Sequence, residues 1–163
     1  MLRAGSPAPL RFAIGAALVL LLLALFRLLR PARLAADPYD PPTRARLAAL
    51  GARTPHVADG AVFADGARAG FAFRKLDEVW VAEGDPAGPP DARVNAIWRF
   101  RDLCDAAGVA PAFVGVAPTM LRAYEDAGMA AVRMEGGRLL ALSADRDPQK
   151  VLRLLAGKER EAV

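Results

Sequence analysis

The amino-acid sequence predicts one α/β domain, of the α+β kind, that is built on a mixed β-sheet and preceded by a single transmembrane helix. Three features of the 163-residue chain support this prediction. A strand–helix–strand–helix pattern runs from Glu78 to Gly128, a hairpin pattern precedes it, and an uninterrupted apolar run lies near the amino terminus. A chain of this length has room for one membrane segment and one domain of about 100 to 120 residues.

The apolar run FAIGAALVLLLLALF and the two leucines after Arg27 predict a transmembrane helix at residues 12–29, following an amino-terminal tail at residues 1–11. At about 1.5 Å per residue this helix is roughly 27 Å long, close to the thickness of a hydrocarbon core. A cleaved signal peptide is the alternative interpretation. Because Arg27, Arg30 and Arg33 crowd the end of the run and disfavour cleavage there, we expect an uncleaved anchor.

The distribution of charge predicts the orientation and the partners of the chain. Two arginines precede the apolar run, whereas three crowd its far end and two more follow shortly after, which predicts a single-pass protein of the cell inner membrane with its carboxy-terminal domain in the cytoplasm. The first 36 residues hold five of the 22 basic groups and none of the 18 acidic ones, which leaves 17 basic and 18 acidic groups in the remainder. We therefore expect an anionic phospholipid membrane as partner, and no DNA.

A linker and a short helix are expected between the membrane segment and the sheet. The sequence RPARLAADPYDPP at residues 30–42 carries four prolines, which predicts a stiff linker without a fold. The domain is then expected over residues 43–163. It begins with a short helix at residues 43–52, in which Leu47 and Leu50 face inward.

The sequence AVFADGARAGFAFRKL predicts a β-hairpin. Asp65 and Gly66 are the expected tight turn, since both positions accept a positive φ. Phe63, Phe71 and Phe73 alternate with smaller or polar residues, so we expect one face of the hairpin to be buried.

A strand–helix–strand crossover follows the hairpin. EVWVAEG is the first strand, and Pro90 and Asp91 fit the first turn of a helix that ends at Gly108. The expected apolar face of this helix is made of Val94, Ile97, Trp98, the stem of Arg101, and Cys104 or Ala107. PAFVGV is the second strand, and a crossover of this length favours a parallel strand pair.

A second helix is expected after this strand. Pro118 and Thr119 begin it, and Gly128 ends it. Its inward-facing residues are Met120, Leu121 and Tyr124.

The loop GDPAGPP after the first strand of the crossover has two interpretations. Glycines before a helix start bring backbone N–H groups close to an anionic ligand, so Gly84, Asp85 and Gly88 are the candidate substrate-binding residues. The alternative, which spacing alone favours, is a rigid connection in which Asp85 caps its own turn. The loop carries neither a Walker pattern nor the glycine pattern of acetyl-CoA-dependent acyltransferases.

The segments VWVAEGDPAG, IWRFRDLCDAAGVAPAFVGVAP and LRAYEDAGM together resemble the first acyltransferase-like half of the cytoplasmic domain of phosphatidylglycerol lysyltransferases, also called lysylphosphatidylglycerol synthetases. The resemblance rests on the GDP-x-G loop, the aromatic and arginine-rich helix, the F-x-x-V strand and the Y-x-x-x-G helix end, over about a third of the chain. It implies an acyltransferase-like (GNAT-like) half-domain. It also implies an enzyme that moves an amino acid from an aminoacyl-tRNA to the glycerol hydroxyl of phosphatidylglycerol.

The sequence departs from this family, in which two such halves follow a multi-span flippase region. It has one predicted span, and after the hairpin VRMEGGRLLALSA it continues only with the amphipathic helix DPQKVLRLLAGKEREAV. The resemblance implies that the catalytic residues and the tRNA surface belong largely to the second half. We therefore expect a truncated domain and carry over no catalytic residue.

Two main hypotheses for function follow. The first is a membrane-anchored, lysyltransferase-like domain that transfers an aminoacyl group from aminoacyl-tRNA to phosphatidylglycerol without a cofactor and is incomplete on its own. The second is a non-catalytic, membrane-tethered interaction module of the same fold, which binds a separate subunit that supplies the missing half. A small-molecule acyltransferase with another acyl donor is a third option.

Several single residues are candidates for a chemical role. Glu83, Tyr124 and Glu125 are candidate participants in acyl transfer, although the spacing of Tyr124 also fits the core and Glu125 also fits a solvated face. Trp80 and Trp98 fit either a lipid-acyl groove or ordinary core packing.

The metal and thiol chemistry of the chain is limited by its composition. His56 is the only histidine and is expected in a solvated loop, which excludes a histidine-pair metal site. The single cysteine, Cys104, excludes an intrachain disulfide.

Overall fold

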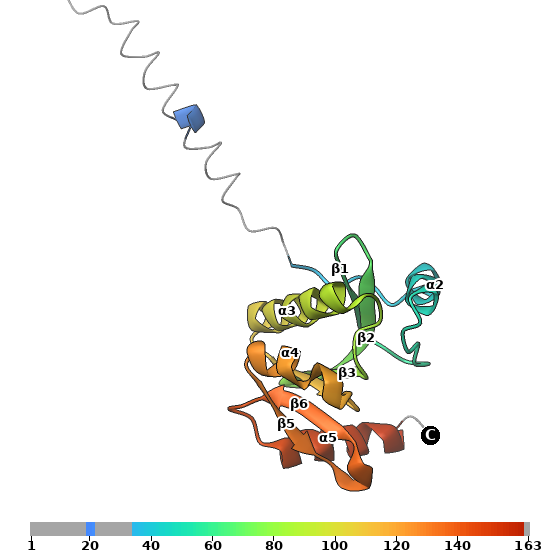
Figure 1. The fold of residues 1–163 in the computed structure, drawn as a ribbon, viewed down its shortest axis with the longest axis vertical. Coiled ribbons are helices and arrows are strands. Elements are labelled where there is room, and N and C mark those ends of the chain that lie inside the picture. Colours follow the sequence, from blue (N-terminus) through green and yellow to red (C-terminus); the bar gives the residue numbers. More distant parts are fainter. Residues whose placement is uncertain (1–18, 22–33, 162–163) are drawn as a thin grey trace, which may run out of the picture. The chain divides into compact units, whose positions relative to one another are not determined.

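The computed structural model describes residues 19–21 and 34–161, and residues from Leu34 onward form one compact unit (Figure 1). The predicted transmembrane helix at residues 12–29 lies outside the described residues except for 19–21, and the predicted tail at residues 1–11 lies wholly outside them. Within the described ranges, no helix combines the length and the apolar character that a membrane crossing needs.

Residues 34–161 are built on a six-stranded mixed sheet with the strand order β1–β2–β3–β4–β6–β5. The strands are β1 (Gly60–Ala64), β2 (Ala69–Leu76), β3 (Val79–Glu83), β4 (Ala110–Val114), β5 (Met129–Arg133) and β6 (Leu139–Ser143). Strands β3 and β4 run parallel, and the other neighbouring pairs of this sheet run antiparallel. The predicted mixed sheet and its parallel pair are confirmed.

Helices cover both faces of this sheet (Figure 1). They are α2 (Pro41–Ala49), α3 (Pro90–Ala107), α4 (Leu121–Asp126), which follows the 3₁₀ turn η1 (Pro118–Met120), and α5 (Pro148–Glu161). Side chains of α3 and α4 pack on one face, in a core that includes Phe71, Phe73 and Phe113. Side chains of α2 and α5 pack on the other face, because alternate residues along each strand point to opposite sides.

Helix α2 begins inside the predicted linker. Asp40 caps it, since its carboxylate accepts a hydrogen bond of 2.9 Å from the backbone N–H of Thr43. Two prolines then occupy the first helical positions, where a missing N–H group has no cost. Just before the helix, Asp37 pairs with Ala61 of β1 through two backbone hydrogen bonds of 2.9 Å, so this part of the chain is attached to the sheet.

The predicted hairpin is confirmed as β1 and β2, but its turn and its burial differ from the prediction. Ala64 pairs with Ala69, so four residues form the connection, and three of them, Asp65, Gly66 and Ala67, have a positive φ. The expectation of one buried face is wrong. Phe71 and Phe73 pack toward α3, whereas Phe63 packs toward α2, because helices cover this hairpin from both sides.

Helix α3 begins at Pro90 and is terminated by Gly108 in the left-handed conformation, with φ +70°, as predicted. The predicted apolar face is only partly right. Ile97 and Cys104 are buried, but Trp98 is 36% exposed and Ala107 is exposed. The buried face of the helix consists of Ala92, Ala96, Ile97, Phe100, Leu103 and Cys104.

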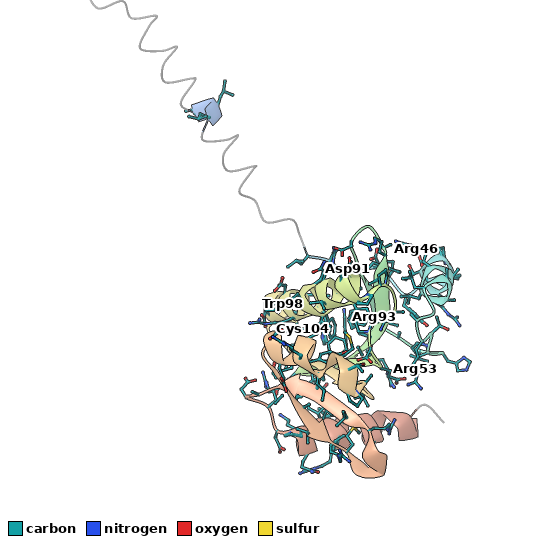
Figure 2. All side chains as sticks on the ribbon, viewed as in Figure 1. Arg46, Arg53, Asp91, Arg93, Trp98 and Cys104 are labelled. Atoms are coloured by element: carbon teal, nitrogen blue, oxygen red, sulfur yellow. The ribbon has the colours of Figure 1, made fainter. Side chains whose placement is uncertain are left out.

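The position of Phe100 explains why the buried face of α3 differs from the predicted one. Its ring centroid lies 5.2 Å from those of Phe71 and Phe73 and 5.3 Å from that of Phe113. The helix is therefore turned so that this ring enters the aromatic cluster, which leaves Trp98 on the outer side of α3 (Figure 2).

Candidate functional site

The loop after β3 begins at the carboxyl end of the parallel strand pair. Glu83 pairs in register with Val114 of β4, and the N–H of Gly84 donates a 2.8 Å hydrogen bond to the carbonyl of Val114. The loop then reaches the hairpin, where Ala87 and Gly70 exchange two backbone hydrogen bonds of 3.0 Å. Ligands of α/β sheets commonly bind outside the carboxyl ends of parallel strands. The loop after β3 therefore lies where a ligand-binding site is expected.

Gly88 makes the close approach of this loop to the hairpin possible. Its φ is +120°, and a Cβ atom built there would lie 2.3 Å from the carbonyl oxygen of Arg68. The side chain of Arg93 in α3 also donates a hydrogen bond to the carbonyl oxygen of Gly88. The glycine is therefore required by packing as well as by backbone conformation.

Asp85 connects the loop to α4. One carboxylate oxygen accepts a 2.8 Å hydrogen bond from the hydroxyl of Tyr124, and the other accepts a 2.9 Å hydrogen bond from the backbone N–H of Ala117. Tyr124 is fully buried, and burial together with the Asp85 carboxylate raises the pKa of its phenol far above the ordinary value of 10. The phenol therefore remains a proton donor to Asp85 at physiological pH.

The predicted alternative, in which Asp85 caps its own turn, is wrong, because the donors to its carboxylate lie outside that turn. The two donors lie 32 and 39 residues further along the chain. The structure brings Gly84, Asp85 and Gly88 together in one loop and gives each a contact within the protein. Their role in binding a substrate stays a prediction.

The remaining candidates are spread over the domain. Glu83 is half-buried at the end of β3, and Glu125 is exposed on α4. Trp80 is half-buried and stacks on Phe73 with a centroid distance of 5.1 Å, whereas Trp98 lies 5.2 Å from the guanidinium of Arg101. Each tryptophan thus has its own neighbour within the domain.

A groove opens at the carboxyl ends of β3 and β4, between α5 and the connection of β5 to β6. It consists of two adjoining hollows, of about 200 Å³ and about 430 Å³, that share Met134, Arg138, Leu152 and Ala156. Arg53, Glu83 and Val114 complete the first hollow, and Arg133, Gln149 and Arg153 complete the second. We call this the basic groove, because the described residues of its lining include four arginines and one carboxylate; Figure 2 labels Arg53.

Sequence reasoning missed the four arginines of the basic groove. They come from four separate segments: Arg53 follows α2, Arg133 ends β5, Arg138 precedes β6, and Arg153 lies in α5. No short motif connects these positions. The amphipathic pattern of the last helix was the one available signal, and it indicated only that the helix packs on the sheet.

The composition of the basic groove defines what it can do chemically. Guanidinium groups stay ionised at any physiological pH and bind carboxylate or phosphate oxygens in pairs. Glu83 is the carboxylate among the described residues of the lining, and it can accept a hydrogen bond or a proton from a hydroxyl group. The groove is therefore suited to a ligand that carries both an anionic group and a hydroxyl.

Comparisons with known proteins agree on one family. The family model described as "Phosphatidylglycerol lysyltransferase, C-terminal" matches residues 58–144. The bifunctional lysylphosphatidylglycerol biosynthesis protein LysX of Mycolicibacterium gilvum is 37% identical over 73 residues, which cover 45% of this chain and 7% of that protein. Its counterpart in Mycobacterium avium is 34% identical over 82 residues, which cover 50% of this chain and 7% of that protein.

A solved structure shares the fold. The structure of L-PGS from Bacillus licheniformis superimposes with a TM-score of 0.54 at 21% identity, over 61% of this chain and 33% of that one. This structural similarity supports the assignment of the fold. The chain thus spans a third or less of the proteins that it matches.

Proposed function

Because the chain belongs to the family of phosphatidylglycerol lysyltransferase carboxy-terminal domains, which serves lysylphosphatidylglycerol synthesis, we propose that it takes part in the transfer of an aminoacyl group from aminoacyl-tRNA to phosphatidylglycerol. One observation carries the proposal. The matched region, residues 58–144, begins just before β1 and ends just after β6, so it contains the whole six-stranded sheet.

Acyl transfer to a lipid hydroxyl needs a group that accepts the hydroxyl proton and cationic or N–H groups that stabilise the developing negative charge. The basic groove offers Glu83 for the first task and guanidinium groups for the second. We propose that Gly84, Asp85 and Gly88 serve substrate binding by fixing the loop at the edge of this groove. The bond from the Gly84 N–H to Val114 supports this role, since it holds the residue next to Glu83.

The complete reaction draws on more than this domain. The segments of 73 and 82 residues that align with the LysX proteins cover 7% of those proteins, so we propose that binding of aminoacyl-tRNA and part of the catalytic machinery come from regions outside the alignment, on the same or a separate polypeptide. The domain would then supply one lobe of the transferase.

A lipid analysis tests the proposal. In cells that lack lysylphosphatidylglycerol, a full-length family member whose corresponding lobe is replaced by residues 34–161 of this chain, which include Arg53 and α5 of the basic groove, is expected to produce aminoacylated phosphatidylglycerol, seen as a new spot on thin-layer chromatography. The matched control is the same chimera carrying Glu83→Gln, which should produce less. A folded chimera without any new lipid would contradict the proposal. It would favour the non-catalytic interaction module instead.

We also propose that the domain works at the inner leaflet of the cell inner membrane, held there by the segment at residues 12–29. Its support is the apolar run with arginines at its far end. A cytoplasmic fluorescent reporter fused after Val163 should be active, whereas a reporter that works only in the periplasm should not. Activity of the periplasmic reporter would reverse the proposed orientation.

A further inference from the structure

The sheet has two edge strands, β1 and β5, and their outer edges differ. At β1, the backbone of Asp37 pairs with Ala61 through two hydrogen bonds of 2.9 Å, so a segment of the chain covers part of that edge. At the opposite edge, β5 pairs with β6, and no other strand among the described residues pairs with it (Figure 1). Within the part of the chain that the structure describes, the outer side of β5 is therefore open to another strand.

We propose that β5 is the contact between two copies of this chain, which join their sheets by antiparallel pairing of β5 with β5 around a two-fold axis at Ala131. The proposal concerns assembly and does not depend on the transfer reaction proposed above. It is supported by the direction of the backbone groups of β5, by the small size of its exposed side chains, and by the charges at its two ends.

The register of β5 with β6 shows which backbone groups are already bonded. In an antiparallel pair, residues that exchange hydrogen bonds with the neighbouring strand alternate with residues whose N–H and C=O groups point away from it. The N–H of Met134 donates a 2.7 Å hydrogen bond to the carbonyl of Arg138, and these two positions continue the register of the pair. Val132 and Ala130 therefore also bond to β6.

The alternate residues of β5 present their backbone groups to the free edge. Arg133 is opposite Leu139, and the carbonyl of Leu139 accepts a 2.8 Å hydrogen bond from the N–H of Gly115, on the side of β4. Because the backbone groups of Leu139 point away from β5, those of Arg133 point outward. By the same alternation, Ala131 and Met129 each present an N–H and a C=O group outward.

These outward residues are spaced for pairing with a second copy of the same strand. In an antiparallel pair centred on Ala131, this residue faces Ala131 of the other copy, and Met129 faces Arg133. Each of these positions presents both its donor and its acceptor outward, so every facing pair can exchange two hydrogen bonds. The contact forms without breaking any bond between β5 and β6.

The side chains of β5 leave room for a second strand. Ala130 and Ala131 are both exposed and point to opposite faces of the sheet, so the edge is open on both sides at its centre. Edge strands are commonly protected from such pairing by a central charge, a proline or a bulge. The strand pairs with β6 without a bulge and has no proline, and its charged residue, Arg133, is at its end.

The charges at the two ends of β5 favour an antiparallel pair of identical strands. Glu125 and Asp126 are exposed at the end of α4, just before β5, where they outnumber Arg122, whereas the exposed Arg133 ends the strand. Antiparallel pairing about Ala131 brings the basic end of each copy to the acidic end of the other. Parallel pairing would instead place Arg133 beside Arg133, which is unfavourable.

Substitution at the two-fold position tests the contact. The full chain is kept in non-ionic detergent with micelles in excess, and its mass is measured by sedimentation equilibrium. We expect a dimer with a Kd of about 10 µM, since the contact is short. Ala131→Lys and Ala131→Glu should each raise this Kd at least about tenfold, because like charges then face each other. An equimolar mixture of the two variants should form dimers again, because unlike charges then face each other.

Ala48→Lys is the matched control. Ala48 is exposed on α2, which packs against β1 and β2 at the other end of the sheet, so the same charge is added away from β5. Its Kd should equal that of the parent chain. Thermal unfolding midpoints measured below the Kd, where all chains are monomeric, should be equal for the parent and the variants at position 131, which excludes loss of the fold as the cause.

Hydrogen exchange of the parent chain examines the strand directly. The amide of Ala131 should exchange slowly at concentrations that favour the dimer and faster on dilution, because its N–H group is bonded only across the contact. The amide of Val132 is bonded to β6 and should exchange slowly at both concentrations.

Three results would overturn the proposal. The first is a parent chain that stays monomeric at about 0.1 mM, which would leave the edge of β5 to a strand of a different polypeptide. The second is a dimer with the same Kd in the parent and in both variants at position 131, which would place the contact elsewhere in the chain. The third is a mixture of the two variants that stays monomeric, which would contradict pairing around Ala131.

Discussion

At the scale of single residues, the pair of Asp85 and Tyr124 connects the loop after β3 to α4 through one hydrogen bond of 2.8 Å. The phenol lies in the aromatic core, where its ring is 4.9 Å from that of Phe113, and the carboxylate takes its second bond from Ala117. A polar pair of this kind fixes the direction in which the loop leaves the sheet.

We predict that Tyr124→Phe lowers the free energy of unfolding by about 1 to 2 kcal/mol, because the partly buried Asp85 oxygen loses its donor while the ring remains. Asp85→Ala should cost more, since it also removes the acceptor of the Ala117 N–H. Urea denaturation measures both effects. Glu125→Gln, an exposed change in the same helix, is the control, and a Tyr124→Phe protein as stable as this control would show that the pair contributes nothing.

Gly88→Ala tests the contact between the loop and the hairpin. We expect a loss of about 2 kcal/mol or more, because the new Cβ meets the Arg68 carbonyl and the backbone keeps a φ of +120°. Gly51→Ala separates the two causes, since Gly51 also has a positive φ but no atom lies within 4 Å of the added Cβ. Thermal unfolding should therefore show a larger loss for Gly88→Ala; equal losses would mean that only the dihedral angle matters.

At the scale of the elements, α3 is held to the sheet by the ring of Phe100. Phe100→Ala should cost about 3 to 5 kcal/mol, as expected for removing a fully buried aromatic side chain from a packed core. Trp98→Ala, on the same helix, should cost less, because this side chain is 36% exposed whereas Phe100 is fully buried. Denaturation curves of the two variants compare them directly. A larger effect at Trp98 would mean that the helix is turned the other way.

Helix α5 is attached to the turn between β2 and β3 by ion pairs. Glu78 accepts a 3.1 Å bond from the ammonium of Lys150 and a 3.2 Å bond from the guanidinium of Arg146. The hydrogen bond and charge of Lys150, followed by the charge of Arg146, lower the pKa of Glu78 below its ordinary value of 4.5. Since the pKa is lower in the folded state, the contribution of these pairs is present above pH 4.5 and is lost as the pH falls through the folded-state pKa.

We therefore expect the backbone amides of α5 to exchange hydrogen faster, relative to those of α3, at pH 3 than at pH 6, once intrinsic exchange rates are taken into account. In Glu78→Gln this relative change should largely disappear. Asp102→Asn, an exposed substitution on α3, should leave it unchanged. Identical pH dependence in the Glu78 variant and the parent would exclude this carboxylate as the cause.

At the scale of the whole molecule, the sequence was a good guide to elements whose signals are local. The glycine at position 108, the prolines before α3 and the run PAFVGV predicted a helix end, a helix start and a buried strand that the structure confirms. The resemblance to the lysyltransferase family, drawn from three short segments, is likewise confirmed by the match over residues 58–144.

The sequence did not predict contacts between residues that lie far apart along the chain. The spacing within α3 does not reveal that Phe100 belongs to a cluster with Phe71 and Phe113, because that depends on how the hairpin docks. Nor can a local pattern show that Asp85 binds Tyr124, or that arginines from four segments line one groove. These features exist only after the sheet has formed.

The two faces of the sheet differ in how they relate to the matched region. Residues 58–144 contain every strand together with α3 and α4, whereas α2 and α5, which pack on the opposite face, lie outside it. The basic groove combines both kinds of segment, since its strand ends come from within the match and its helical wall comes from α5. A change of sequence in that wall would reshape the groove while the aromatic interior stayed as it is.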